Sequence, residues 1–232
     1  QRVDKPGEKI DINSKIEVRG NPIPYVSRGG LKLEKAIEYF NLSLKNKVCM
    51  DIGASTGGFT DCMLQNGAKK VYAIDVGYGQ FDWKLRQDER VVLKERTNIR
   101  YVDNSDIGEM VDFISIDVSF ISLKLVLPVA KKLLKEEGEI AALIKPQFEA
   151  GKEKVGKKGI VRDINVHKEV VSDIYNFCIG LDLCVEDLTY SPIKGGTGNI
   201  EYLFHIKKGG TNKYMDVEEK IKKVVYESHN VL

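Results

Sequence analysis

The 232-residue sequence predicts an α/β protein with a mostly parallel, doubly wound sheet. Three observations lead to this fold class. Hydrophobic residues make up 42% of the chain and charged residues 30%, as in an ordinary globular protein with a buried core. From residue 48 onward, short runs rich in Val and Ile alternate with longer segments of helical periodicity. The last two expected strands follow each other across a Gly-rich turn, so these two are expected to be antiparallel.

The start of the chain predicts little structure that could stand alone. Residues 9–12 and 15–19 have the composition of short strands, separated by the turn-prone Asn13-Ser14. Two strands cannot form a core by themselves, so they either pack on the main domain or end a module that begins earlier. A first residue of Gln rather than Met favours the second interpretation. Residues 21–26 contain two prolines and are expected to be a stiff linker to a domain at 27–208.

The elements of the main domain follow from periodicity and composition. A helix is expected from Ser27, whose hydroxyl suits an N-cap, to about Tyr39. Runs rich in β-branched residues predict strands at 48–52, 70–76, 91–93, 113–117, 139–144, 184–190 and 201–207. Apolar residues at helical spacing predict helices at 59–65, 123–134 and 164–180. 

A last helix is expected within residues 209–232, beginning near Asn212. Its apolar residues recur on one side, which predicts that the helix docks on the sheet. This side comprises Tyr214, Val217, Ile221, Val224 and Val225.

Bulk properties exclude several classes of protein. The formal net charge is only +2, so nucleic-acid affinity requires local clustering of cations. The four cysteines form no CxxC pair and the three histidines are far apart, so we expect neither a disulfide framework nor a metal site. The sequence contains no signal peptide and no apolar run of the roughly 20 residues that cross a membrane. We therefore expect a cytoplasmic monomer.

A Gly-rich loop, residues 51–59 (DIGASTGGF), follows the first predicted strand and opens a helix. Its glycines allow a ligand to approach the backbone and the free N–H groups of the helix start. The spacing is not GxGxxG, and a leading Asp51 would repel a pyrophosphate but suit an ammonium or sulfonium group. Asp75 ends the second strand, where a carboxylate can hold both hydroxyls of a ribose. An adenosine with a cationic amino-acid tail is S-adenosylmethionine, the predicted cofactor.

The residues expected to contact this cofactor surround the ends of the first strands. Asn98 follows the third strand and could contact the adenine edge or only cap a turn. The set is Asp51, Gly53, Ala54, Ser55, Gly57, Gly58, Asp75, Val76, Asn98 and Asp117.

Four ionisable residues fall at strand ends or just inside a helix, where ligands bind in open parallel sheets: Lys32, Asp117, Lys145 and Glu201. A ribose hydroxyl is a poor nucleophile at neutral pH, and Lys145 is the best candidate for the general base that activates it. Burial and a second cation lower the pKa of a lysine, whereas nearby carboxylates raise it. A buried ion-pair network without catalysis is the alternative. The Asp-Pro-Pro-Tyr motif expected for amino-group methylation is absent, and DVSF at residues 117–120 takes its place.

Five motifs together resemble the TlyA family, bacterial proteins often labelled haemolysins and similar to FtsJ-type RNA ribose 2′-O-methyltransferases. They are residues 27–33 (SRGGLKL), 51–60 (DIGASTGGFT), 117–122 (DVSFIS), 144–149 (IKPQFE) and 198–202 (GNIEY). The resemblance runs from Val3 to Lys207 and implies a Rossmann-like, S-adenosylmethionine-dependent methyltransferase fold with seven strands.

The resemblance also implies function. It assigns a Lys-Asp-Lys-Glu tetrad to Lys32, Asp117, Lys145 and Glu201, and it implies cytidine 2′-O-methylation in the ribosomal RNA of assembled subunits. Family members carry an N-terminal S4-type RNA-binding domain, and residues 1–20 match only its last portion.

Residues 150–162 (AGKEKVGKKGIVR), here called the basic segment, follow Lys145. A loop this long inside a compact domain is usually functional or disordered. Its cations could meet RNA phosphates beside Lys145, without reading sequence, although a charged run is often only a solvated loop. The RNA-binding candidates are Arg28, Lys152, Lys154, Lys157, Lys158 and Arg162.

Two other functions compete with RNA methylation. One is the membrane-active haemolysin suggested by the family label, against which stand the lack of an export signal and of a membrane span. The other is a module that binds RNA and cofactor without catalysis, against which stands the complete tetrad.

Overall fold

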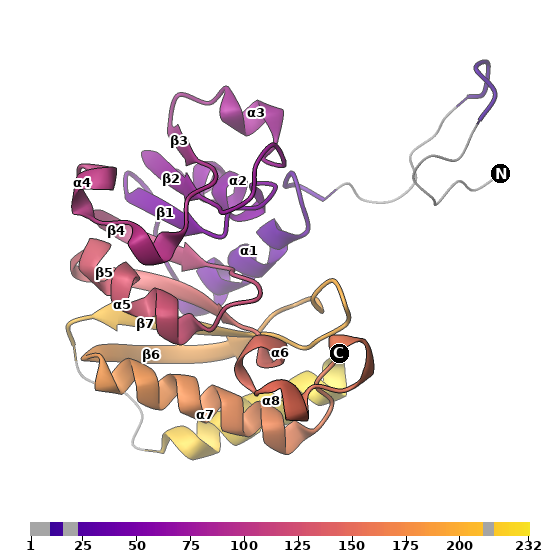
Figure 1. Cartoon of the computed structure of the whole chain (residues 1–232), viewed down its shortest axis with the longest axis vertical. Helices are drawn as coiled ribbons and strands as arrows, with labels where there is room; N and C mark the ends of the chain where they lie inside the picture. Colours follow the sequence, from indigo (N-terminus) through magenta and orange to yellow (C-terminus); the bar gives the residue numbers. More distant parts are fainter. Residues whose placement is uncertain (1–9, 16–22, 211–215) are drawn as a thin grey trace.

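A computed structural model describes residues 10–15, 23–210 and 216–232. Seven strands form one sheet in the order β3-β2-β1-β4-β5-β7-β6, which Figure 1 shows from top to bottom. Strand β7 runs antiparallel to both of its neighbours, and the pairings among β1 to β5 are parallel. The strands are β1 (Val48–Ile52), β2 (Lys70–Ile74), β3 (Val91–Lys94), β4 (Val111–Ile116), β5 (Leu134–Ile144), β6 (Leu183–Tyr190) and β7 (Tyr202–Lys208). The predicted mostly parallel, seven-stranded sheet is confirmed.

Helices cover both faces of the sheet and bury two separate hydrophobic clusters. The longer helices are α1 (Gly29–Phe40), α2 (Gly58–Gln65), α5 (Leu123–Leu133), α7 (Ile164–Gly180) and α8 (Val217–Val231). Side chains of α1 and α2 pack on one face, and those of α5, α7 and α8 pack on the other. Alternation along β4 serves both clusters, since Phe113 faces the first and Ile114 the second. Burial on both sides explains why the central strands are continuous apolar runs.

Short elements join these parts near the ends of the strands. They are α3 (Trp83–Arg86), α4 (Asn104–Ile107), α6 (Pro146–Glu149) and the 3-10 turns η1 (Ile99–Tyr101), η2 (Lys152–Lys154) and η3 (Lys157–Gly159). None has the length or periodicity from which the sequence could have predicted it.

The predicted N-cap of the first helix is wrong. Helix α1 begins at Gly29, and its N-cap is Arg28, which makes no side-chain capping bond. The preceding chain is held instead by α2, because the backbone N–H of Val26 donates to Asp61 Oδ2 over 2.9 Å. A tertiary hydrogen bond therefore takes the place of the local cap that Ser27 suggested.

Several strand boundaries also differ from the prediction. Strand β5 begins at Leu134 rather than at residue 139, because a register shift between Val111 and Phe113 of β4 extends its start. Strand β2 ends at Ile74, one residue before Asp75, and β7 begins at Tyr202, one residue after Glu201. Both carboxylates thus leave the ladder for the edge of the sheet.

The two ends of the chain are described only in part. Residues 10–12 form no strand; Asp11 instead accepts bonds from Asn13 and Ser14 in a turn. Outside the described residues lie most of the predicted S4-type remnant, the first two residues of the predicted linker, and Asn212 and Tyr214. Helix α8 begins at Val217 and packs on α7 and β6, with Ile221 buried, which agrees with the predicted docking.

Candidate active site

Four ionisable side chains meet at the carboxyl edge of the sheet. Lys32 Nζ lies 2.7 Å from Glu201 Oε2 and 3.5 Å from Asp117 Oδ2. Lys145 Nζ lies 2.5 Å from Asp117 Oδ1. They come from α1, the end of β4, the end of β5 and the start of β7. The residues that the sequence assigned to one site therefore form one ion-pair network.

Asp117 is the centre of this network. It directly follows β4, and its backbone N–H donates to the carbonyl of Ile52 at the end of β1 over 2.9 Å. This bond fixes the carboxylate where two strands end side by side. Each of its oxygens faces a different lysine, so one negative charge lies between two positive ones.

The network is removed from water. Lys32 and Lys145 are each 8% exposed and Glu201 is 2% exposed. Burial alone would lower the pKa of Lys32, but Asp117 and Glu201 outweigh it, and the pKa lies above its ordinary value. Lys32 therefore stays a cation throughout the physiological pH range.

Lys145 is held by the turn that follows it. It is the N-cap residue of α6, and Pro146 occupies the first position of that helix. Its ammonium donates to Ser119 Oγ over 3.0 Å. Glu149, at the end of α6, accepts from Ser122 Oγ at 2.6 Å and from the backbone of Leu123 at 2.8 Å. The loop after β4 and the turn after β5 are thus tied together around Lys145.

Two cavities open on either side of Asp117, a larger one of about 810 Å³ and a smaller one of about 530 Å³. Gly53, Ser55 and Asp117 line both. The Gly53 backbone is in the left-handed region, and an added Cβ would overlap the carbonyl oxygen of Asp117. Only glycine therefore allows the ends of β1 and β4 to approach so closely.

The larger cavity fits a nucleoside. Asp75 lies in its wall, fixed by bonds from the backbone N–H of Ser55 at 2.7 Å and of Gly77 at 2.6 Å. Val76 lines the same cavity and is 68% exposed although it is apolar. Asn98 also lines it, and its Oδ1 accepts from the backbone of Arg100 at 3.1 Å. The two interpretations of Asn98, turn cap and cavity wall, are therefore compatible.

Asp51, predicted to contact the cofactor, is enclosed by the fold. It is fully buried, lines neither cavity, and accepts bonds from Thr60 Oγ1 at 2.7 Å and from Ser115 Oγ at 3.2 Å. Burial raises its pKa to about 7, against the effect of these two hydroxyls. The carboxylate fastens the end of β1 to α2 and β4. Gly57 also lines neither cavity, while Ala54 and Gly58 line the smaller one.

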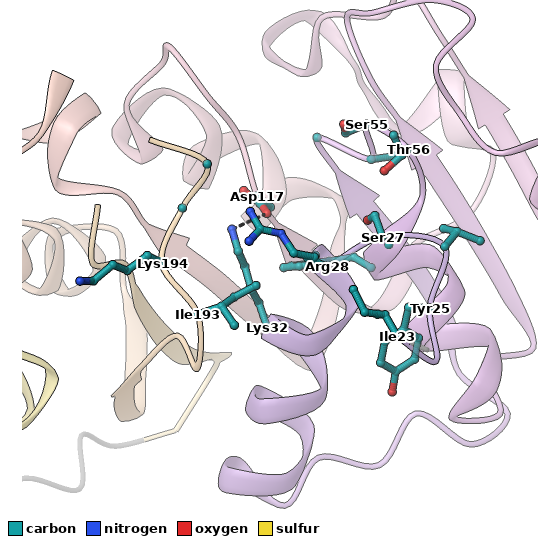
Figure 2. A pocket seen from close by; sticks show the side chains of 18 residues that line it. Ile23, Tyr25, Ser27, Arg28, Lys32, Ser55, Thr56, Asp117, Ile193 and Lys194 are labelled. Atoms are coloured by element: carbon teal, nitrogen blue, oxygen red, sulfur yellow. Dashed lines mark hydrogen bonds and ion pairs between the residues drawn. The ribbon is translucent and has the colours of Figure 1, made fainter. Parts of the chain in front are cut away.

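The smaller cavity carries positive charge. Figure 2 shows Arg28 and Lys32 pointing toward Asp117, with Lys194 of the opposite wall pointing away. The exposed Arg28 borders the entrance, next to Tyr25 and Ile23. A polyanion or a polar group of a large ligand would meet cations there before it reached Asp117.

A model of the FtsJ-like methyltransferase family matches residues 25–208. The chain belongs to this family. More distant methyltransferase structures, at 14% and 16% identity, share the fold of this FtsJ-like chain, with TM-scores of 0.58 and 0.57. The family confirms the predicted fold class and the predicted cofactor, S-adenosylmethionine.

Relatives of this FtsJ-like chain confirm the resemblance to TlyA proteins. YqxC of Bacillus subtilis, provisionally named an rRNA methyltransferase, is 56% identical over 234 residues, which cover 100% of this chain and 83% of YqxC. The 16S/23S rRNA (cytidine-2′-O)-methyltransferase TlyA of Mycobacterium tuberculosis is 43% identical over 88% of this chain and 76% of its own length. A structure from Streptococcus thermophilus, provisionally named a hemolysin, is 51% identical with a TM-score of 0.89, over 98% of this chain and 82% of that one.

The basic segment connects α6 to α7 in the FtsJ-like chain. Lys152, Lys157, Lys158 and Arg162 are exposed, and none is ion-paired with a carboxylate among the described residues. Lys154 differs, since its ammonium lies 2.6 Å from Glu169 Oε1. The segment therefore presents cations to solvent, with Lys154 already paired.

Several residues of the site were not predicted from the sequence. Ser119 and Glu149 hold Lys145, and both lie inside motifs that had been noted only for their neighbours. Phe120 is 91% exposed, has a positive φ of 63°, and lies 4.9 Å from the ring centroid of Phe148. The sequence signal that could have indicated Phe120 is an aromatic residue three positions after Asp117. Lys194 lies beside the Gly-rich turn, where a single lysine gives no pattern.

The described residues offer neither a membrane-spanning helix nor a cluster of metal ligands. No helix there has both the length and the apolar character needed to cross a membrane. In the same part of the chain, no three His, Cys, Asp or Glu residues come together in an arrangement suited to a metal ion.

The buried carboxyl of Asp51 predicts a pH effect on stability. Its pKa is raised on folding from 3.8 to about 7, so its contribution is full below about pH 4 and is lost as the pH rises to about 7. In the Asp51→Asn variant this side chain does not titrate, so this loss of stability with rising pH does not occur. We expect the stability of the unaltered protein relative to the variant to fall by up to about 1.4 kcal/mol per pH unit in that window and to stay constant above it. Urea unfolding from pH 4 to 8 measures this, and parallel curves would contradict it.

Gly195 predicts a steric effect on Glu201. An added Cβ there would overlap Glu201 Oε1, so the carboxylate, whose Oε2 is paired with Lys32, must then move. Gly195→Ala is expected to lower kcat for methyl transfer on the order of a hundredfold, as displaced site groups do. Gly180→Ala, where a Cβ meets nothing within 4 Å, is the matched control and should keep normal activity. Equal activity of the two variants would show that the position of Glu201 is unimportant.

Proposed function

We propose that this protein transfers a methyl group from S-adenosylmethionine to the ribose 2′-hydroxyl of a cytidine in ribosomal RNA. The observation that carries the proposal is the ion-pair network of Lys32, Asp117, Lys145 and Glu201 at the wall shared by the two cavities. A methyl donor on one side and a hydroxyl on the other would meet at Asp117, between two lysines.

The residues of the larger cavity fit the cofactor. Asp75 offers a fixed carboxylate to ribose hydroxyls, Val76 an apolar surface to the adenine, and Gly53 an open backbone. When bound, S-adenosylmethionine supplies an electrophilic methyl group. Asp51 contributes indirectly. It fixes the end of β1 to α2 and β4, in place of the direct contact expected from the sequence.

In the proposed mechanism Lys145 is the general base. Its side-chain nitrogen would accept the proton as the 2′ O–H bond breaks and the new O–CH₃ bond forms, with the methyl group released from the sulfonium and S-adenosylhomocysteine as the leaving group. Asp117 and Ser119, which both line the larger cavity, hold the nitrogen at 2.5 and 3.0 Å. Lys32, kept protonated by its two carboxylates, stabilises the negative charge that develops on the oxygen. Glu201 keeps Lys32 in this orientation.

Two further features support RNA as the acceptor. The smaller cavity and the basic segment offer Arg28, Lys157 and Lys158 to phosphates. The exposed Phe120, beside Phe148, offers an aromatic face on which an unpaired base can stack. Cytidine and the ribosomal source are suggested by the names of the TlyA relatives. A ribosomal substrate also agrees with the cytoplasmic location expected from the sequence.

The deciding experiment measures tritium transfer from labelled S-adenosylmethionine to purified ribosomal subunits, followed by nucleoside analysis. We expect label in 2′-O-methylcytidine. Lys145→Met should lower kcat at least about a hundredfold, as loss of a general base does, without loss of cofactor affinity. Lys135→Met is the matched control, because Lys135 is exposed at the other end of the same strand and should be dispensable.

Other outcomes select the rival functions. Full activity of Lys145→Met would exclude Lys145 as the base. Cofactor binding without transfer to any RNA would favour a module that binds without catalysis. Leakage of liposomes exposed to the protein, without methyl transfer, would favour the haemolysin suggested by the label.

The basic segment predicts a salt-dependent effect on RNA affinity. Replacing Lys157 and Lys158 together by Ala should raise the RNA Kd about tenfold and reduce the slope of log Kd against log salt by about 1.4. Lys45 and Lys69 are equally exposed but lie at the opposite edge of the sheet, so their double Ala variant is the control. Fluorescence anisotropy at several salt concentrations measures both quantities. Identical slopes for the two double variants would refute an RNA contact at Lys157 and Lys158.

A further inference from the structure

Two buried polar side chains that the proposed mechanism does not use bind the backbone of the same residue, Val161. Asn199 and His167 are both 0% exposed. Asn199 Oδ1 accepts from the backbone N–H of Val161 at 3.0 Å, and His167 Nε2 bonds to the carbonyl of Val161 at 3.0 Å. Val161 lies near the end of the basic segment, so both bonds fix this segment to the rest of the domain.

The side chain of Asn199 joins two loops. Its amide nitrogen donates to the carbonyl of Gly159 at 2.8 Å and to Thr197 Oγ1 at 2.9 Å. Its backbone carbonyl accepts from the N–H of Gly195 at 2.9 Å. Asn199 therefore connects the basic segment to residues 195–198, a loop whose Gly195 borders the smaller cavity and lies against Glu201.

His167 binds the backbone carbonyl of the same residue, Val161. A carbonyl only accepts, so Nε2 carries the proton and Nδ1 accepts from the hydroxyl of Tyr202 at 2.8 Å. Burial lowers the pKa of His167, which agrees with this neutral form. Tyr202 directly follows Glu201. The backbone N–H of Val161 is thus held by Asn199 and its carbonyl by His167, which is itself bonded to Tyr202, the neighbour of Glu201.

The part of the basic segment before Val161 is closed into a compact turn. The N–H of Gly156 donates to the carbonyl of Ile160 at 3.0 Å, and the N–H of Gly159 to the carbonyl of Gly156 at 3.1 Å. Lys157 and Lys158 lie inside this turn, and neither is ion-paired with a carboxylate among the described residues. Their position relative to the smaller cavity therefore depends on the bonds at Gly159 and Val161.

We propose that Asn199 is a positioning residue for the RNA substrate: its buried amide fixes the turn that carries Lys157 and Lys158 to the loop that borders the smaller cavity. This inference rests on the proposed function and deepens it. A phosphate held by the two lysines then determines which ribose reaches Asp117 and Lys145. Asn199 acts through the lysines and touches neither the RNA nor the cofactor.

A double-mutant cycle tests this role. Asn199→Ala should raise the RNA Kd about tenfold and reduce the salt slope by about 1.4, as the loss of two phosphate contacts does. Adding Lys157→Ala and Lys158→Ala to Asn199→Ala should raise Kd by less than about twofold more, because the lysines no longer act. The cofactor affinity should stay unchanged. Asn104→Ala, the same change at an exposed site on α4, is the control.

A purely structural role of Asn199 predicts different results. Its loss would lower the melting temperature and affect kcat, cofactor binding and RNA binding alike, and its effect on Kd would multiply with that of the lysines, to about a hundredfold. Multiplying effects, or an unchanged salt slope in Asn199→Ala, would overturn the proposal. An unaltered protein that methylates no RNA would instead count against the proposed function.

A second pair of variants guards against misfolding of Asn199→Ala. His167→Leu releases the carbonyl of Val161 and should give the same higher Kd and reduced salt slope. His167→Gln keeps a donor for that carbonyl and should restore most of the affinity. Equal RNA affinities of His167→Leu and the unaltered protein would also overturn the proposal, because RNA binding would then not depend on the bond to the carbonyl of Val161.

Discussion

Two lysine ammonium groups can share a buried edge of this sheet only because a carboxylate lies between them. Like charges in a low-dielectric site repel strongly, and each buried charge also loses its hydration. Asp117 offsets both effects with one oxygen toward each lysine, and Glu201 adds a second negative charge at Lys32. The positions of β4, β5, β7 and α1 are therefore coupled, because each contributes one member of the network.

The same carboxylate divides the space above the sheet. Asp117 and Gly53 line both cavities, and the missing side chain of Gly53 lets the ends of β1 and β4 lie close together. Asp51 stabilises this junction from within, through Thr60 and Ser115. Two ligands bound on either side would meet at one wall. The fold therefore supplies proximity, which alone can account for much of the acceleration of a two-substrate reaction.

The sequence predicted what depends on local pattern and failed where distant contacts decide. The strands and long helices follow from apolar periodicity, and the tetrad residues stood out as charges at strand ends. Ser27 was predicted as a cap because local chemistry suits it, but a bond from Val26 to Asp61 sets the start of α1. Asp51 was predicted to contact the cofactor because it leads the Gly-rich loop. Its complete burial has no signal in the neighbouring sequence. The bond from Val161 to Asn199 spans 38 residues of sequence and could not be seen before folding.

The roles of the two lysines follow from the number of carboxylates around each. Lys32 faces Asp117 and Glu201, and its pKa is raised, so it is suited to remain a cation and poorly suited to accept a proton. Lys145 faces one carboxylate and a neutral hydroxyl, Ser119, and it follows a strand whose end is fixed by Pro146 and Glu149. A general base needs a nitrogen held at a defined point, close to the proton that it accepts. Lys145 is held in this way and Lys32 remains a cation, so Asp117 links the two lysines without making them equivalent.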